Sequence, residues 1–109
     1  MRYGASRTRF AAAIALLWLA APARGHAAQT EVAAGGQLAQ RWCATCHVVG
    51  ANQTGSVPQG PPSFPMIAKS GLGAEQLRAF LSHPHGAMPD LSLTRTEIDD
   101  LVAYIQSLR

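Results

Sequence analysis

Apolar side chains recur at helical spacing in several short stretches of the chain, and no stretch alternates apolar and polar residues as a half-buried strand does. The strongest pattern lies at the C-terminus. There Thr94 and Glu97 have the spacing of a capping box, in which each side chain binds the other residue's backbone N–H. The apolar residues that follow fall on one helical face: Ile98, Leu101, Val102, Ile105 and Leu108. They predict an amphipathic helix that ends the chain.

A second helix is predicted from Glu31 to about Cys46, with residues 29–34 as a frayed lead-in. Its apolar residues fall near one face: Val32, Leu38, Ala39 and Trp42. Gly35 and Gly36 lie inside this helix, where each costs up to about 1 kcal/mol relative to alanine. Glycines retained at such a cost indicate that another element approaches the helix closely.

Two shorter helices are predicted between these. Ser63 is expected to cap one that runs to Lys69 and turns its apolar residues inward, namely Phe64, Met66 and Ile67. The other opens at Gly73 and stops at Pro84, with Leu77, Phe80 and Leu81 at helical spacing. Residues 50–62 and 85–93 have no period and are expected to be irregular. The predicted fold class is all-α, with about four short helices joined by long loops.

Residues 1–28 have the organisation of a cleavable secretory signal peptide. A basic start is followed by an apolar run from Phe10 to Ala23, which is shorter than the about 20 residues that span a bilayer, and then by small residues. We expect cleavage within residues 25–28, which leaves residues 29–109 as one exported domain without stable membrane insertion. The leader holds four of the nine basic residues, so five basic residues remain against six acidic ones, a formal net charge of −1. The mature part therefore has no basic tract, and binding to nucleic acid is not indicated.

Both cysteines of the chain stand in the sequence "CATCH", residues 43–47. On a helical turn the thiols of Cys43 and Cys46 project to one side, where they can add to the two vinyl groups along one edge of a porphyrin, and His47 follows within reach of the iron. A thioredoxin-like redox pair would need a βαβ context, and a zinc site would need four protein ligands. A disulfide would close too small a loop to stabilise such a small domain. One covalent haem c also accounts for the long loops, because they can wrap around it.

From Glu31 to its end, the chain resembles a small class I monohaem cytochrome c of the bacterial periplasm. The resemblance rests on "CATCH", "GPPSF", "MPDLSLT" and "EIDDLVAYIQSL". It implies that the first and last helices cross near Gly35 and Tyr104, with Ala39 where the family usually has an aromatic residue. It also implies that His47 is the proximal ligand and that the carbonyl of Pro62 holds its Nδ1–H, with Pro61 as the neighbouring alternative.

The distal ligand is expected to be Met88, from the resemblance and from its place in a loop stiffened by the following proline. The other candidates are weaker. Met66 lies within an apolar helical turn, where methionine usually fills the core. His83 and His85 flank a helix end, where an exposed histidine is favourable to the helix dipole.

With His47 and Met88 as axial ligands, the chain is expected to be a monomeric one-electron carrier and not an enzyme, because no open position remains at the iron. Its partners would be redox proteins: a membrane respiratory complex, an oxidase or an exported dehydrogenase. Two alternatives remain open. The chain could be a subunit of a larger exported redox enzyme, or a haem-based enzyme or ligand sensor in which the Met88 bond is labile.

Overall fold

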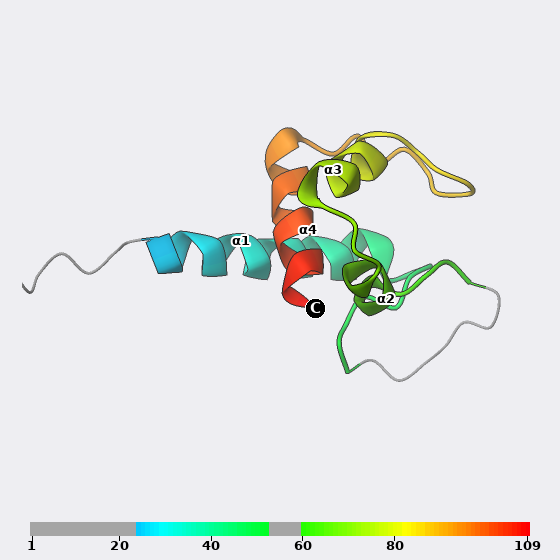
Figure 1. Ribbon diagram of the computed structural model, residues 1–109. Helices are drawn as coiled ribbons and strands as arrows, with labels where there is room; N and C mark the ends of the chain where they lie inside the picture. The colour runs from blue at the N-terminus through cyan, green and yellow to red at the C-terminus, as the bar shows by residue number, and fades with distance from the viewer. Residues whose placement is uncertain (1–23, 53–59) are drawn as a thin grey trace, which may run out of the picture.

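The computed structural model describes residues 24–52 and 60–109. Its elements follow in the order α1 (Arg24–Leu38), η1 (Ala39–Cys43), α2 (Phe64–Lys69), α3 (Ala74–Ser82) and α4 (Arg95–Ser107). Within these ranges every regular element is a helix, which confirms the all-α fold class. In Figure 1, α4 crosses the long first helix, while α3 and α2 lie on either side of this crossing. None of the helices in the described ranges is both long and apolar enough to span a bilayer.

Helix α4 supplies the centre of the core, as its apolar pattern predicts. Ile98, Leu101, Val102 and Ile105 are all buried. The predicted capping box is present: Thr94 N–H donates to the Glu97 carboxylate at 2.8 Å, and Glu97 N–H donates to the Thr94 hydroxyl at 3.2 Å. The backbone hydrogen bond from Thr94, and then that from its hydroxyl, lower the pKa of the Glu97 carboxyl. The ionised form therefore stabilises the folded chain, and this contribution is lost as the pH falls through the lowered pKa.

The crossing of α1 and α4 depends on Gly35, as expected. Gly35 is buried, and a Cβ built on it would lie 2.0 Å from the carbonyl oxygen of Asp100 and 2.8 Å from Cβ of Tyr104. The two main chains therefore meet at a distance that only glycine permits. Ala39, one turn further along, is fully buried, so a small side chain fills the position where the resemblance implies an aromatic residue.

The first helix differs from its prediction at both ends. It begins at Arg24 and not near Glu31, and residues 25–31 are exposed along its first turns, which project from the body in Figure 1. This stretch, GHAAQTE, has no apolar face, so hydrophobic periodicity does not predict a helix over it. The expectation of a frayed lead-in over residues 29–34 is therefore wrong.

At its other end the helix continues as a π-helical turn. Ala44 N–H donates to the Ala39 carbonyl, five residues back, at 3.0 Å. A π turn holds one more residue than an α turn, so side chains within it and after it are displaced from the expected face. Trp42 is consequently 52% exposed, whereas Cys43 is buried. The position of Trp42 in the apolar pattern predicts an ordinary core residue, and this prediction is wrong because of the π turn.

The two short helices bury fewer residues than expected. In α2, Ser63 caps the helix as predicted, and Phe64 and Ala68 face the core. Met66 is 66% exposed because it stands two residues from Phe64, on the opposite side of a short helix. In α3, Leu77 is buried, but Phe80 is 51% exposed and its ring packs edge-on against His85, with centroids 5.6 Å apart. Met66 and Phe80 are thus not core residues.

Arg78 ties α3 to α4. Its Nε donates to Asp99 at 2.6 Å, and its Nη1 donates to Glu75 at 2.7 Å. The hydrogen bond to Asp99 is the main reason that the pKa of Arg78 lies above its ordinary value. From the sequence, Arg78 and Asp99 are each expected to lie on a solvated helix face. Both side chains remain partly exposed in the structure, and in addition they form an ion pair between the two helices.

Candidate functional site

The two cysteines lie on one turn that continues from the π-helical segment. Both Cys46 N–H and His47 N–H donate to the carbonyl of Cys43, at 3.1 and 2.8 Å. Residues three and four apart are neighbours on such a turn, so this local geometry groups the three side chains on one side of it. Both cysteines are free; Cys43 is buried and Cys46 is exposed. Burial raises the pKa of the Cys43 thiol.

His47 is held by a residue that returns from the following loop. Its Nδ1 lies 2.8 Å from the carbonyl oxygen of Pro62. A carbonyl can only accept, so Nδ1 carries the proton and Nε2 keeps the lone pair that a metal requires. The structure places Pro62 at this contact, and not Pro61. The His47 ring also packs against Phe64, with centroids 5.5 Å apart and planes at 59°.

Met88 lies in the segment between α3 and α4. Its backbone N–H donates to the carbonyl of His85 at 3.0 Å, which closes a turn, and Gly86 within that turn has φ +56°. The Met88 side chain is partly buried. Among the described residues, His47 contacts Pro62 and Phe64, and the one hydrogen bond of Met88 goes to His85, so no hydrogen bond joins the two expected ligands directly.

The alternative ligands lie elsewhere or are engaged otherwise. Nδ1 of His83 lies 3.2 Å from the carbonyl of Ala79, and Nδ1 of His85 lies 3.3 Å from the carbonyl of Phe80. Both imidazoles thus bind carbonyls of the last turn of α3, and both residues are exposed. The Met66 side chain lies on the exposed side of α2, away from the core of the domain. Of these side chains, Met88 is the partly buried one.

The sequence alone does not indicate how α4 contributes to this region. The hydroxyl of Tyr104 donates to the carbonyl of Val49 at 2.7 Å, two residues after His47. The ring of Phe64 contacts both the His47 ring and the Tyr104 ring, and its centroid lies 6.4 Å from that of Tyr104. The sequence feature that could have indicated this contact is the position of Tyr104 on an otherwise apolar helix face. The hydroxyl of a buried tyrosine usually finds a hydrogen-bond partner.

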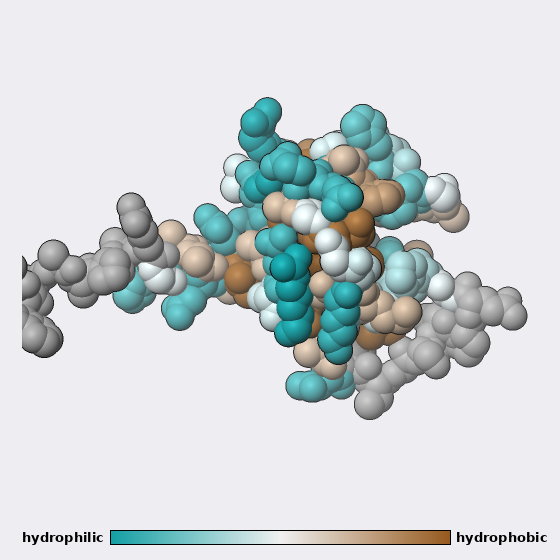
Figure 2. Space-filling view, in the orientation of Figure 1, coloured by the Kyte–Doolittle hydropathy of each residue, from teal (hydrophilic) through white to brown (hydrophobic). Residues whose placement is uncertain are grey.

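The residues present fit a c-type haem. Two free thiols, an imidazole with its Nδ1 protonated and a thioether are the groups that attach such a haem and ligate its iron. The described part of the chain also leaves large apolar side chains at its surface: Trp42, Met66 and Phe80. In Figure 2, brown atoms show between the teal side chains over the middle of the body, with α3 above and α2 below. Within residues 24–52 and 60–109, no three His, Cys, Asp or Glu side chains gather as a metal site.

Comparison with known proteins defines the class. Residues 30–105 match the family described as cytochrome c oxidase, cbb3-type, subunit III. Cytochrome c-552 of Bradyrhizobium diazoefficiens is 41% identical over 97 residues, which cover 88% of this chain and 92% of that protein. No solved structure matches the chain significantly. The fold and these matches define a small monohaem cytochrome c, a haem protein that carries electrons. The chain belongs to the cytochrome c family whose description names subunit III of the cbb3-type oxidase.

Proposed function

We propose that the chain is an exported one-electron carrier with a single haem c, attached by Cys43 and Cys46 and ligated by His47 and Met88. The observation that carries the proposal is the contact between His47 Nδ1 and the Pro62 carbonyl at 2.8 Å, directly beside the turn with both thiols. A protonated and oriented Nδ1 leaves Nε2 as the ligand atom and makes the imidazole a stronger base.

Each residue has a defined part. Burial raises the pKa of the Cys43 thiol. Cys43 and Cys46 would each attach the haem by adding an S–H bond across one vinyl group, sulfur to one carbon and hydrogen to the other. The Met88 thioether is a soft ligand that favours the ferrous state and so raises the reduction potential. The bound haem supplies the Fe(III)/Fe(II) couple. If His47 and Met88 both bind the iron, the protein would leave no ligand position for a substrate, which suits a carrier and not an enzyme.

The export and the partners belong to the same proposal. Residues 1–23 of the expected signal peptide lie outside the described residues, and cleavage within 25–28 would shorten α1 by its first exposed residues. The mature domain, residues 29–109, would act in the periplasm as a monomer. It would exchange electrons with a membrane respiratory complex, an oxidase or an exported dehydrogenase. The family description, which names an oxidase subunit, favours an oxidase among these.

The test is the intact mass of the protein exported by a bacterium able to mature c-type cytochromes, with a pyridine haemochrome spectrum after denaturation. The expected result is one haem that stays with the denatured chain, on a polypeptide that starts between residues 26 and 29. Cys43→Ser and Cys46→Ser are the matched variants, and each should lose haem–chain linkages. A wild-type chain without haem would refute the proposal. Carbon monoxide binding by the reduced wild type would instead favour the sensor alternative, because it requires a labile Met88.

A further inference from the structure

The chain that follows the CATCH turn is held at successive residues by a returning segment. The His47 ring contacts the Pro62 carbonyl, and the carbonyl of Val48 accepts from Phe64 N–H at 2.9 Å. Both contacts are made by residues 62–64, so this short stretch holds one side of the segment 47–49. The Phe64 side chain that follows this return is buried and packs on the His47 ring.

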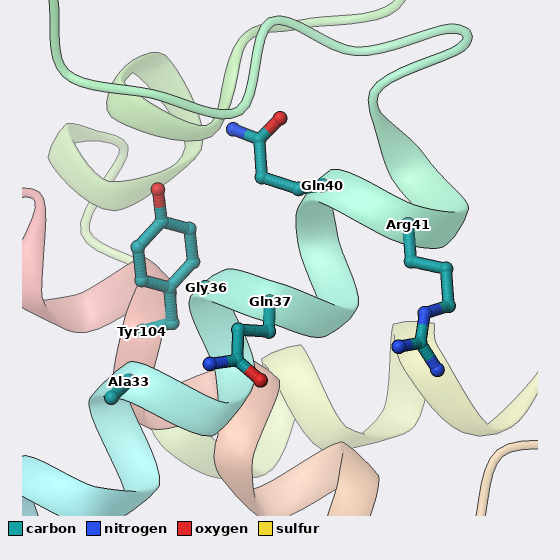
Figure 3. A pocket seen from close by; sticks show the side chains of 6 residues that line it. All are labelled: Ala33, Gly36, Gln37, Gln40, Arg41 and Tyr104. Atoms are coloured by element: carbon teal, nitrogen blue, oxygen red, sulfur yellow. The ribbon is translucent and has the colours of Figure 1, made fainter.

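The third attachment comes from a different part of the fold. The Tyr104 hydroxyl donates to the carbonyl of Val49 at 2.7 Å, across 55 residues of sequence, and Val49 is fully buried. Tyr104 is itself positioned from α1, since a Cβ on Gly36 would lie 3.2 Å from its ring. Figure 3 shows the ring standing beside Gly36 with its hydroxyl directed away from α1. The phenol therefore connects the helix crossing to the segment that carries His47.

We propose that Tyr104 is a positioning residue for His47. Its hydrogen bond to Val49 holds the main chain after His47, so that the Nδ1–H···O=C bond to Pro62 keeps its length and direction. This inference rests on the proposed function, in which His47 ligates the haem iron. Tyr104 acts through the main chain and through Phe64, and it touches neither the thiols nor Nε2.

The expected sign follows from the basicity of the imidazole. A strong Nδ1–H···O=C bond makes the imidazole more electron-donating, which stabilises the oxidised iron more than the reduced iron. If the Tyr104 hydroxyl is removed, the segment loosens, the bond to Pro62 weakens and the imidazole donates less. The reduction potential should therefore rise, and the Nδ1 proton of His47 should exchange with solvent faster.

The experiment compares holoprotein of the wild type, Tyr104→Phe and Ser107→Ala. Tyr104→Phe keeps the ring against Gly36 and removes only the hydroxyl. Ser107→Ala is the control, because it removes a hydrogen bond of 2.6 Å to the main-chain carbonyl of Tyr104 itself and leaves the Tyr104 hydroxyl and its bond to Val49 in place. The readouts are the midpoint potential, the paramagnetically shifted NMR signals of His47 in the oxidised protein, and the exchange rate of its Nδ1 proton. Tyr104→Phe should change all three and Ser107→Ala none.

A second measurement does not depend on how well Tyr104→Phe folds. Tyr104 is the one tyrosine outside the leader, so growth on 3-fluorotyrosine labels this position in the mature protein. Fluorination makes the phenol a stronger donor, and the potential should then shift downward, opposite to Tyr104→Phe. A purely structural role predicts no such reversal of sign. The inference is overturned if the protein binds haem through His47, but the midpoint potential, the His47 NMR signals and the Nδ1 proton exchange rate are the same in all variants. The proposed function would then still stand. If the wild type binds no haem, the proposed function fails.

Discussion

The glycine at the crossing of α1 and α4 permits a quantitative prediction, for the substitution Gly35→Ala. The added Cβ would meet the carbonyl oxygen and carbon of Asp100 at 2.0 and 2.5 Å. These are main-chain atoms and cannot rotate away as a side chain can. An ordinary contact begins near 3.4 Å, so the two helices must separate by roughly 1.4 Å at this point.

Two opposing effects set the magnitude. Alanine is the better helix former by about 1 kcal/mol, whereas overpacking costs about 1–3 kcal/mol, and contact with main chain belongs at the upper end. We expect Gly35→Ala to lower the free energy of unfolding by about 2 kcal/mol, which corresponds to a fall in Tm of about 10 °C for a domain of this size. The larger Gly35→Leu should destabilise at least as much.

The assay is denaturant and thermal unfolding of the holoprotein, followed by far-UV circular dichroism. Gly36→Ala is the matched control. It adds the same methyl group to the same helix, but meets only the ring edge of Tyr104 at 3.2 Å, which can move by a few tenths of an ångström. Its stability should stay within about 1 kcal/mol of the wild type. If Gly35→Ala is as stable as Gly36→Ala, the helices do not cross at Gly35 and the reasoning is refuted.

The remaining predictions concern the site and the capping box. Cys43→Ser and Cys46→Ser should each yield little stable holoprotein, and a cooperatively folding haem-free variant with native helix content would contradict this. Met88→Ala should lower the reduction potential and abolish the long-wavelength absorption band of iron–methionine ligation. Both effects are expected whether the vacated ligand position stays open or is taken by His85. The double variant Met88→Ala, His85→Ala should bind carbon monoxide readily. If Met88→Ala retains that band, another residue is the ligand. Glu97→Gln should destabilise at neutral pH but not at a pH below the lowered pKa of Glu97, because the wild-type carboxyl is then protonated too; a difference that persists unchanged in acid would exclude a charge effect. Stability is measured by unfolding at each pH.

Local patterns predicted the parts of the fold that depend on neighbouring residues. The capping box and the apolar face of α4 require only spacing along one helix, and the CATCH turn requires only five consecutive residues. The core positions of Leu77 and Phe64 follow in the same way. For these elements, one helical period decides which side chains face the core.

The wrong and the missing predictions have physical causes that cannot be read from the apolar pattern of a single helix. Trp42 is turned outward because it lies in a π-helical turn, and a regular α-helical period does not include the additional residue of such a turn. The pairing of Arg78 with Asp99, and the bond from Tyr104 to Val49, join segments far apart in sequence. Such partners become evident only once the helices are placed against each other.

The contact between Tyr104 and Val49 also constrains the order of events during biosynthesis. The two residues are 55 positions apart, so the loop between them closes only after the last helix has been made, and closing such a loop costs chain entropy that grows with its length. The crossing at Gly35 closes a still longer loop. A chain synthesised from its N-terminus therefore presents the CATCH sequence well before the fold can close around it. In the proposed function, the two thiols would then be open to a haem during that interval, before the final helix completes the enclosure.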